Sequence, residues 1–133
     1  MSKQVLVLST KNDSVSIIAE AILTRYLPEF TISSAGTKPS QNVNKEIKQA
    51  LIKDGVWSDR LTPKHIDRVM NSDYDMVIIL SDEAAKKCPD FTEETVIIHI
   101  DYDESEYSNN FKLERLIKTI KMELIPITRN QFS

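Results

Sequence analysis

Two short, uninterrupted apolar runs constrain the fold of this chain most: Val5–Leu8 and Met76–Leu80. Their apolar residues are continuous rather than alternating, which is typical of a strand that is buried on both faces. Two further strands are predicted at Phe30–Ala35, closed by Gly36, and at Val96–Ile100. Strands of this kind occur in parallel sheets, whose faces are covered by helices.

Helices are predicted between and after these strands from apolar spacing and from capping residues. The last one has a well-marked apolar stripe and is expected to end at Pro126, because proline disrupts helix hydrogen bonding. The predicted helices are Asp13–Tyr26, Asn44–Lys53, a short helix starting at Thr62-Pro63, Asp82–Lys87 and Asn110–Ile125. This alternation predicts one α/β domain, residues 1–133, with three layers and right-handed crossovers.

Composition excludes several classes of function. The 133 residues carry 17 basic and 20 acidic side chains, a net charge of -3, so no nucleic-acid partner is expected. No apolar stretch approaches the roughly 20 residues that span a membrane. A lone cysteine, Cys88, indicates a reducing compartment, and we predict a cytoplasmic protein. The histidines and acidic residues show no zinc spacing and nucleotide motifs are absent, so neither a metal nor a cofactor is expected.

The first strand-to-helix loop is rich in hydroxyl groups. In α/β sheets, ligands bind where strands end and helices begin, and a helix N-terminus attracts anions. The loop consists of Ser9, Thr10, Lys11, Asn12, Asp13, Ser14, Val15 and Ser16. Because serine, asparagine and aspartate are also the usual turn and N-cap residues, composition alone leaves an anion site and a plain turn both open.

An ordered set of motifs extends along the chain. Val5–Ala21 contains a strand, this loop and a helix with Ala19-Glu20-Ala21, and Ser34-Ala35-Gly36-Thr37 ends the second strand. Tyr74–Ile78 and Cys88-Pro89 follow. Over roughly residues 4–125, this order resembles the low-molecular-weight tyrosine phosphatase and thioredoxin-type arsenate reductase superfamily, whose first loop reads Cys-x5-Arg-Ser/Thr. The resemblance implies a four-stranded parallel sheet with strand order 2-1-3-4 and an anion-binding loop at Ser9–Ser16.

The chain departs from that pattern at the positions that carry the catalytic chemistry in the family. Ser9 stands at the position of the nucleophilic cysteine and Val15 at that of the arginine, while Lys11 and Asp13 replace a glycine and a small residue. The loop cannot usefully ionise a serine hydroxyl near neutral pH. Two lost hydrogen bonds from arginine cost roughly 3–6 kcal/mol, or about 10²- to 10⁴-fold in affinity. The Asp13 carboxylate adds repulsion, so at most weak anion binding is expected.

The remaining family positions do not restore the chemistry. Asp101 or Asp103 falls where the family carries its general-acid aspartate, but the proline that follows it there is missing, and a solvated acidic loop explains both residues. Arsenate reduction needs a relay of thiols, which Cys88 alone cannot supply.

We therefore predict a catalytically impaired, phosphatase-like domain that binds an unknown protein partner or a weakly held anion. The alternative is an active phosphatase or arsenate-reductase-like enzyme in which Asp103 or His99 assists a Ser9 nucleophile. A third possibility is docking through the loop face, which would require an exposed apolar patch around Val15, Ile17 and Trp57.

Overall fold

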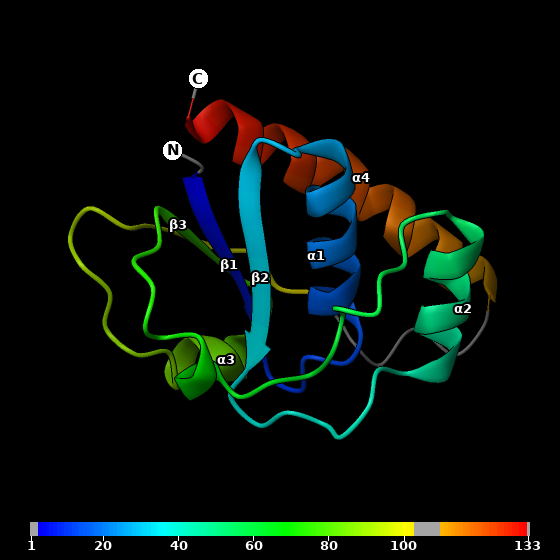
Figure 1. Cartoon of the computed structure of the whole chain (residues 1–133), viewed down its shortest axis with the longest axis horizontal. Helices are drawn as coiled ribbons and strands as arrows, with labels where there is room; N and C mark the ends of the chain where they lie inside the picture. The colour runs from blue at the N-terminus through cyan, green and yellow to red at the C-terminus, as the bar shows by residue number, and fades with distance from the viewer. Residues whose placement is uncertain (1–2, 103–109, 133) are drawn as a thin grey trace.

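The computed structural model describes residues 3–102 and 110–132 of the chain. Strands and helices alternate along it as the apolar runs predict (Figure 1). The strands are β1 (Lys3–Ser9), β2 (Phe30–Gly36), β3 (Met76–Ile79) and β4 (Val96–His99). The helices are α1 (Val15–Tyr26), α2 (Lys45–Lys53), the 3-10 helix η1 (Ile66–Arg68), α3 (Asp82–Lys86) and α4 (Asn110–Gln131).

The four strands form one parallel sheet in the order β2-β1-β3-β4, which confirms the predicted fold class and strand order. Because all strands run in the same direction, their carboxyl ends meet at one edge of the sheet, at the bottom of Figure 1. The β1–α1 loop lies at this edge.

Each face of the sheet packs against its own apolar cluster. On one face, Val5 and Val7 of β1 pack with α1, α2 and α4 in the main core. On the other face, Leu6 and Leu8 pack with Ala84 of α3 and form a smaller cluster. This alternation of side chains along a strand buried on both sides is the reason for the continuous apolar run in the sequence. In Figure 1, α1 and α2 lie to the right of the strands, and α3 lies near their lower ends.

Two predicted helix boundaries are wrong. Helix α4 continues through Pro126 to Gln131. Proline has no N–H, so one carbonyl group of the preceding turn lacks its helical hydrogen bond. Because Pro126 is on the exposed side of the helix, water can bond that carbonyl group. No helix begins at Thr62-Pro63, since this segment pairs with the end of β2: the Gly36 N–H donates to the Lys64 carbonyl group at 2.8 Å, and His65 forms a β-bridge with Gly36. The 3-10 helix η1 starts at Ile66, capped by the His65 side chain.

Within the described residues, none of the helices is both long and apolar enough to cross a membrane.

Candidate functional site

The β1–α1 loop closes on the side chain of Ser9. The Ser9 hydroxyl group lies 2.7 Å from the Ser16 hydroxyl group and accepts the Asn12 backbone N–H at 3.1 Å. All three residues are fully buried. Residues at the two ends of the loop are thereby joined under it by neutral hydrogen bonds.

Asn12 is the centre of this buried network. Its side-chain amide donates to the hydroxyl groups of Ser16 at 2.8 Å and Ser34 at 2.9 Å, and its carbonyl oxygen accepts the Lys64 N–H at 3.0 Å. Its φ of 52° places it in the left-handed region, which asparagine adopts more readily than most residues. One side chain therefore ties together segments that are 22 and 52 residues apart in the sequence.

The network ends at a partly buried ion pair, which was not predicted from the sequence. The Ser34 hydroxyl group donates to the carboxylate of Glu20, which is 9% exposed, and the Lys64 ammonium nitrogen lies 4.0 Å from the same carboxylate oxygen. Burial raises the pKa of Glu20, and burial lowers the pKa of Lys64. The one signal in the sequence is that Glu20 interrupts the apolar face of its helix; nothing marks Lys64.

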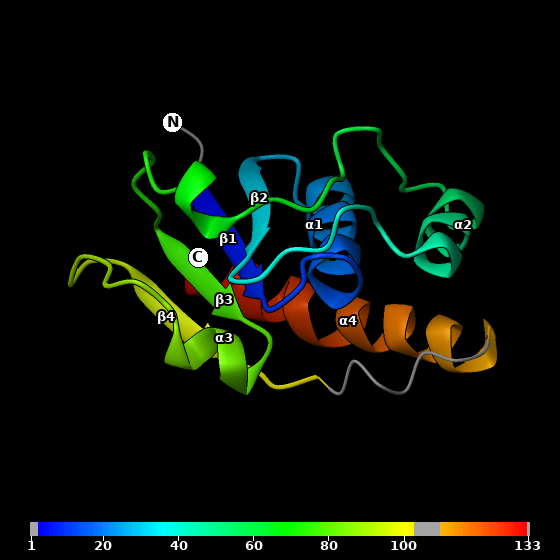
Figure 2. The ribbon, with the colours of Figure 1, turned by 90° about the horizontal axis from the view of Figure 1, so that it is seen from below.

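The segment after β2 holds the outer side of the loop. The backbone N–H of Thr37 donates to the Ser9 carbonyl group at 3.2 Å, and that of Lys38 donates to the Thr10 carbonyl group at 2.8 Å. A Cβ atom at Gly36 would lie 2.6 Å from the Thr10 carbonyl oxygen, so only glycine fits there. Figure 2, which looks onto this edge of the sheet, shows the two segments side by side.

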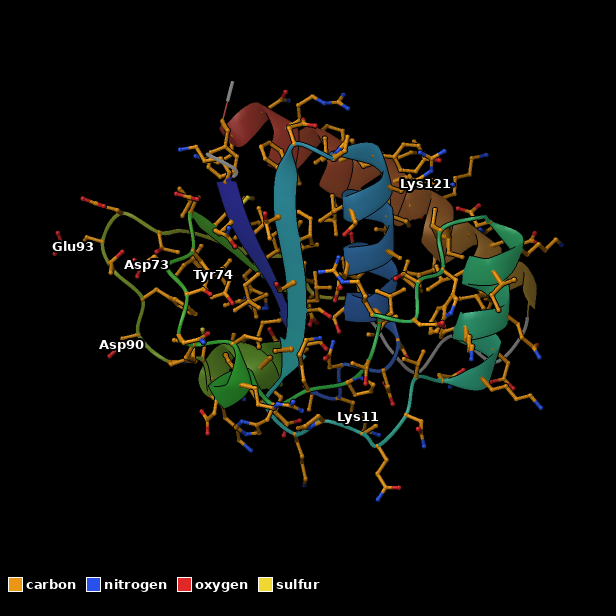
Figure 3. All side chains as sticks on the ribbon, viewed as in Figure 1. Lys11, Asp73, Tyr74, Asp90, Glu93 and Lys121 are labelled. Atoms are coloured by element: carbon orange, nitrogen blue, oxygen red, sulfur yellow. The ribbon has the colours of Figure 1, made fainter. Side chains whose placement is uncertain are left out.

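The three loop residues that the resemblance identifies as replacements, Val15, Lys11 and Asp13, differ in their surroundings. Val15, at the arginine position, is fully buried in the main core. Lys11 is exposed and lies at the edge of the molecule in Figure 3. The Asp13 carboxylate accepts hydrogen bonds from the hydroxyl groups of Ser14 at 3.1 Å and Ser40 at 2.7 Å. Neither Val15 nor Asp13 therefore brings a positive charge to the loop.

The first turn of α1 keeps donors that an anion could use. Ser14, at the N-cap position, makes no capping hydrogen bond with its side chain. In the part of the chain that the structure describes, the backbone N–H groups of Val15, Ser16 and Ile17 also have no hydrogen-bond acceptor. Free N–H groups at a helix start attract negative charge. The loop therefore retains backbone donors, in residues that are fully buried, without the arginine that would reinforce them.

The predicted helper His99 is paired elsewhere. Its Nε2 atom lies 3.2 Å from an oxygen of Asp82, and Asp101 accepts the Asp82 backbone N–H at 3.1 Å. The ligand-type atoms of these three exposed residues lie within 4.8 Å of one another, a spacing that a metal ion could use. Because the His99–Asp82 ion pair and the hydrogen bond between Asp82 and Asp101 already account for this spacing, we assign no metal to the cluster. Asp103 lies outside the described residues.

The other two residues singled out in the sequence have structural contacts. Cys88 is half-buried against the smaller cluster, and burial, together with the neighbouring charge of Asp90, raises the pKa of its thiol. A raised thiol pKa opposes nucleophilic chemistry. Trp57 is half-buried against the main core, and its indole N–H donates to Asp59 at 3.1 Å. Since Val15 and Ile17 are fully buried, the apolar patch required for docking through the loop face is not present.

Comparison with solved structures supports the same fold. The thioredoxin-dependent arsenate reductase Cg_ArsC1' of Corynebacterium glutamicum is 24% identical, with a TM-score of 0.77; the match covers 97% of this chain but only 61% of that protein. A YwlE mutant from Bacillus subtilis has a TM-score of 0.80 at 15% identity, covering 99% of this chain and 100% of that one. The tyrosine phosphatase Wzb from Escherichia coli K30, in complex with sulphate, has a TM-score of 0.73 at 16% identity, covering 92% and 93%.

A family model also matches the sequence. The model describes the low molecular weight phosphotyrosine protein phosphatases, and it matches residues 4–115, from the first strand into the last helix. Since this match includes most of the chain and agrees with the strand order of the sheet, the protein belongs to the low molecular weight phosphotyrosine protein phosphatase family.

Proposed function

We propose that this protein is a catalytically impaired member of its family, with a binding or regulatory role. The environment of the Ser9 hydroxyl group supports this most directly. Its hydrogen-bond partners are a neutral hydroxyl group and a backbone N–H, and no imidazole, amine or carboxylate contacts it among the described residues. A serine nucleophile needs a base beside it. The pairing of His99 with Asp82 counts against the alternative in which His99 supplies that base.

At most weak anion binding fits the loop. The backbone N–H groups at the start of α1 favour a tetrahedral anion, and the related E. coli phosphatase Wzb forms a complex with sulphate, an ion of this shape. The bidentate hydrogen bonds of an arginine are absent, because position 15 is a valine, whose side chain is buried in the main core. Without these hydrogen bonds, the affinity for phosphate or sulphate should be about 10²- to 10⁴-fold lower than that of a loop with the arginine. Either ion should therefore bind only in the millimolar range or weaker.

Hydrolysis of p-nitrophenyl phosphate tests the catalytic part of the proposal. The wild type should show no more turnover than Ser9→Ala, which removes the hydroxyl group but retains the rest of the loop. Ser9→Cys alone should also stay near that level, because the arginine is still missing. Turnover by the wild type that Ser9→Ala abolishes would refute the proposal.

A repair series separates a lost active site from a changed scaffold. The double variant Ser9→Cys, Val15→Arg restores both the thiol and the guanidinium group, and some activity should return if the loop geometry is still suitable. Because position 15 is buried, a thermal unfolding measurement must accompany each variant to show that it is folded.

Titration of ¹⁵N-labelled protein with sulphate tests the binding part. Shifts should be confined to the amides of residues 10–17 and should saturate only at millimolar concentrations. Shifts spread evenly over the surface would contradict a site at the loop. A protein partner and a cytoplasmic location stay predictions from the sequence.

A further inference from the structure

A second cleft lies away from the mouth of the loop, between the later half of α1, β2 and residues 55–61. Its volume is about 550 Å³, within the range of small-molecule sites. Its apolar walls are formed by Ala21, Pro28, Phe30, Ile32, Val56 and Trp57. None of these residues belongs to the loop Ser9–Ser16.

The charged groups of this cleft are unbalanced. Arg25 and Arg60 line it, both are exposed, and neither guanidinium group has an ion-pair partner within the described residues. The acidic residue of the cleft, Glu20, lies 4.0 Å from the Lys64 ammonium nitrogen, and the positive charge of Arg60 also acts on its carboxylate. The two arginines therefore leave a net positive charge beside an apolar wall.

Another cleft, between α2 and α4, has a different character. Its volume is about 700 Å³, but its lining charges neutralise one another across the cleft: Lys53 pairs with Glu114 at 3.5 Å and Lys121 with Asp54 at 2.9 Å. These two ion pairs account for those charged side chains, so no ligand is needed to explain them. Neither Arg25 nor Arg60 forms an ion pair of this kind in the part of the chain that the structure describes.

We propose that the cleft beside Trp57 binds a small amphiphilic anion, a molecule with an apolar, ring-sized body and one acidic group. The body packs against Phe30, Ile32 and Trp57, and the acidic group accepts hydrogen bonds from the guanidinium groups of Arg25 and Arg60. This site is separate from the proposed anion site at the loop, so either one can fail without the other.

The lone tryptophan makes the proposal measurable, because emission at Trp57 reports on the cleft alone. The probe is 8-anilinonaphthalene-1-sulfonate, and its matched neutral probe is N-phenyl-1-naphthylamine, which has the same rings without the sulfonate group. The sulfonate should quench Trp57 in a saturable, one-to-one manner confirmed by calorimetry, and the neutral probe should bind at least about tenfold more weakly.

Substitutions test whether Arg25 and Arg60 bind the sulfonate group. Arg25→Ala combined with Arg60→Ala should weaken sulfonate binding by at least about tenfold, since each removes a charge-assisted hydrogen bond. Arg129→Ala, an exposed arginine outside both clefts, is the control and should leave the affinity unchanged. The proposal is overturned if the wild type binds no sulfonate at millimolar concentration, if the neutral probe binds equally well, or if the double variant binds like the control.

Discussion

Replacing Asn12 by alanine should destabilise the fold more than a change in a surface loop normally does. The substitution removes three side-chain hydrogen bonds, to Ser16, Ser34 and the Lys64 N–H, worth about 1 kcal/mol each. It also forces alanine to adopt a φ of 52°, which adds about 1 kcal/mol. We expect a total loss of about 4 kcal/mol, a large part of the 5–15 kcal/mol typical of a domain.

Two companion variants divide this cost. Asn12→Gly loses the same hydrogen bonds but adopts the positive φ without strain, so it should be less damaging by about 1 kcal/mol. Asn44→Ala is the matched control: Asn44 caps α2 with hydrogen bonds to two backbone N–H groups near the surface, and its loss should cost only about 1 kcal/mol.

Urea unfolding, followed by Trp57 fluorescence and by far-ultraviolet circular dichroism, gives the free energy of unfolding for each variant. The two signals should coincide, which shows that the chain unfolds in one step. If Asn12→Ala costs no more than Asn44→Ala, the buried network does not hold the loop, and the reasoning is wrong.

Three further predictions concern other parts of the chain. Burial raises the pKa of Glu20 above its ordinary value of 4.5, so the folded protein keeps this proton to a higher pH than the unfolded chain and should lose stability as the pH rises above that value. Glu20→Gln should flatten this slope in urea unfolding, and an unchanged slope would contradict the assignment. Pro126→Ala should raise the free energy of unfolding by about 1–2 kcal/mol, because it restores an N–H inside α4, and a lower melting temperature would count against that explanation. The Cys88 thiol, with its raised pKa, should react with iodoacetamide at pH 8 more slowly than free cysteine and speed up in urea; equal rates would show that the thiol is not shielded.

The place of the candidate loop in the fold was predictable from the sequence, but the arrangement of its side chains was not. A hydroxyl-rich loop between an apolar strand and a helix marks a ligand position in any parallel sheet, so Ser9–Ser16 could be identified from local sequence. The role of Asn12 could not, because its partners Ser34 and Lys64 come from distant segments. The pairing of His99 with Asp82 likewise depends on how the ends of β3 and β4 meet.

The order of strands and helices was determined by the sequence alone, since continuous apolar runs and helical spacing reflect which faces of each element are buried. The likeness to a family added the strand order 2-1-3-4, which the structure confirms. Local rules failed at Pro126, where the result depends on which side of the helix meets water. Only the tertiary structure decided that Val15 is turned into the core and that the Ser9 hydroxyl group is enclosed by neutral donors, because both depend on contacts formed after the chain has folded.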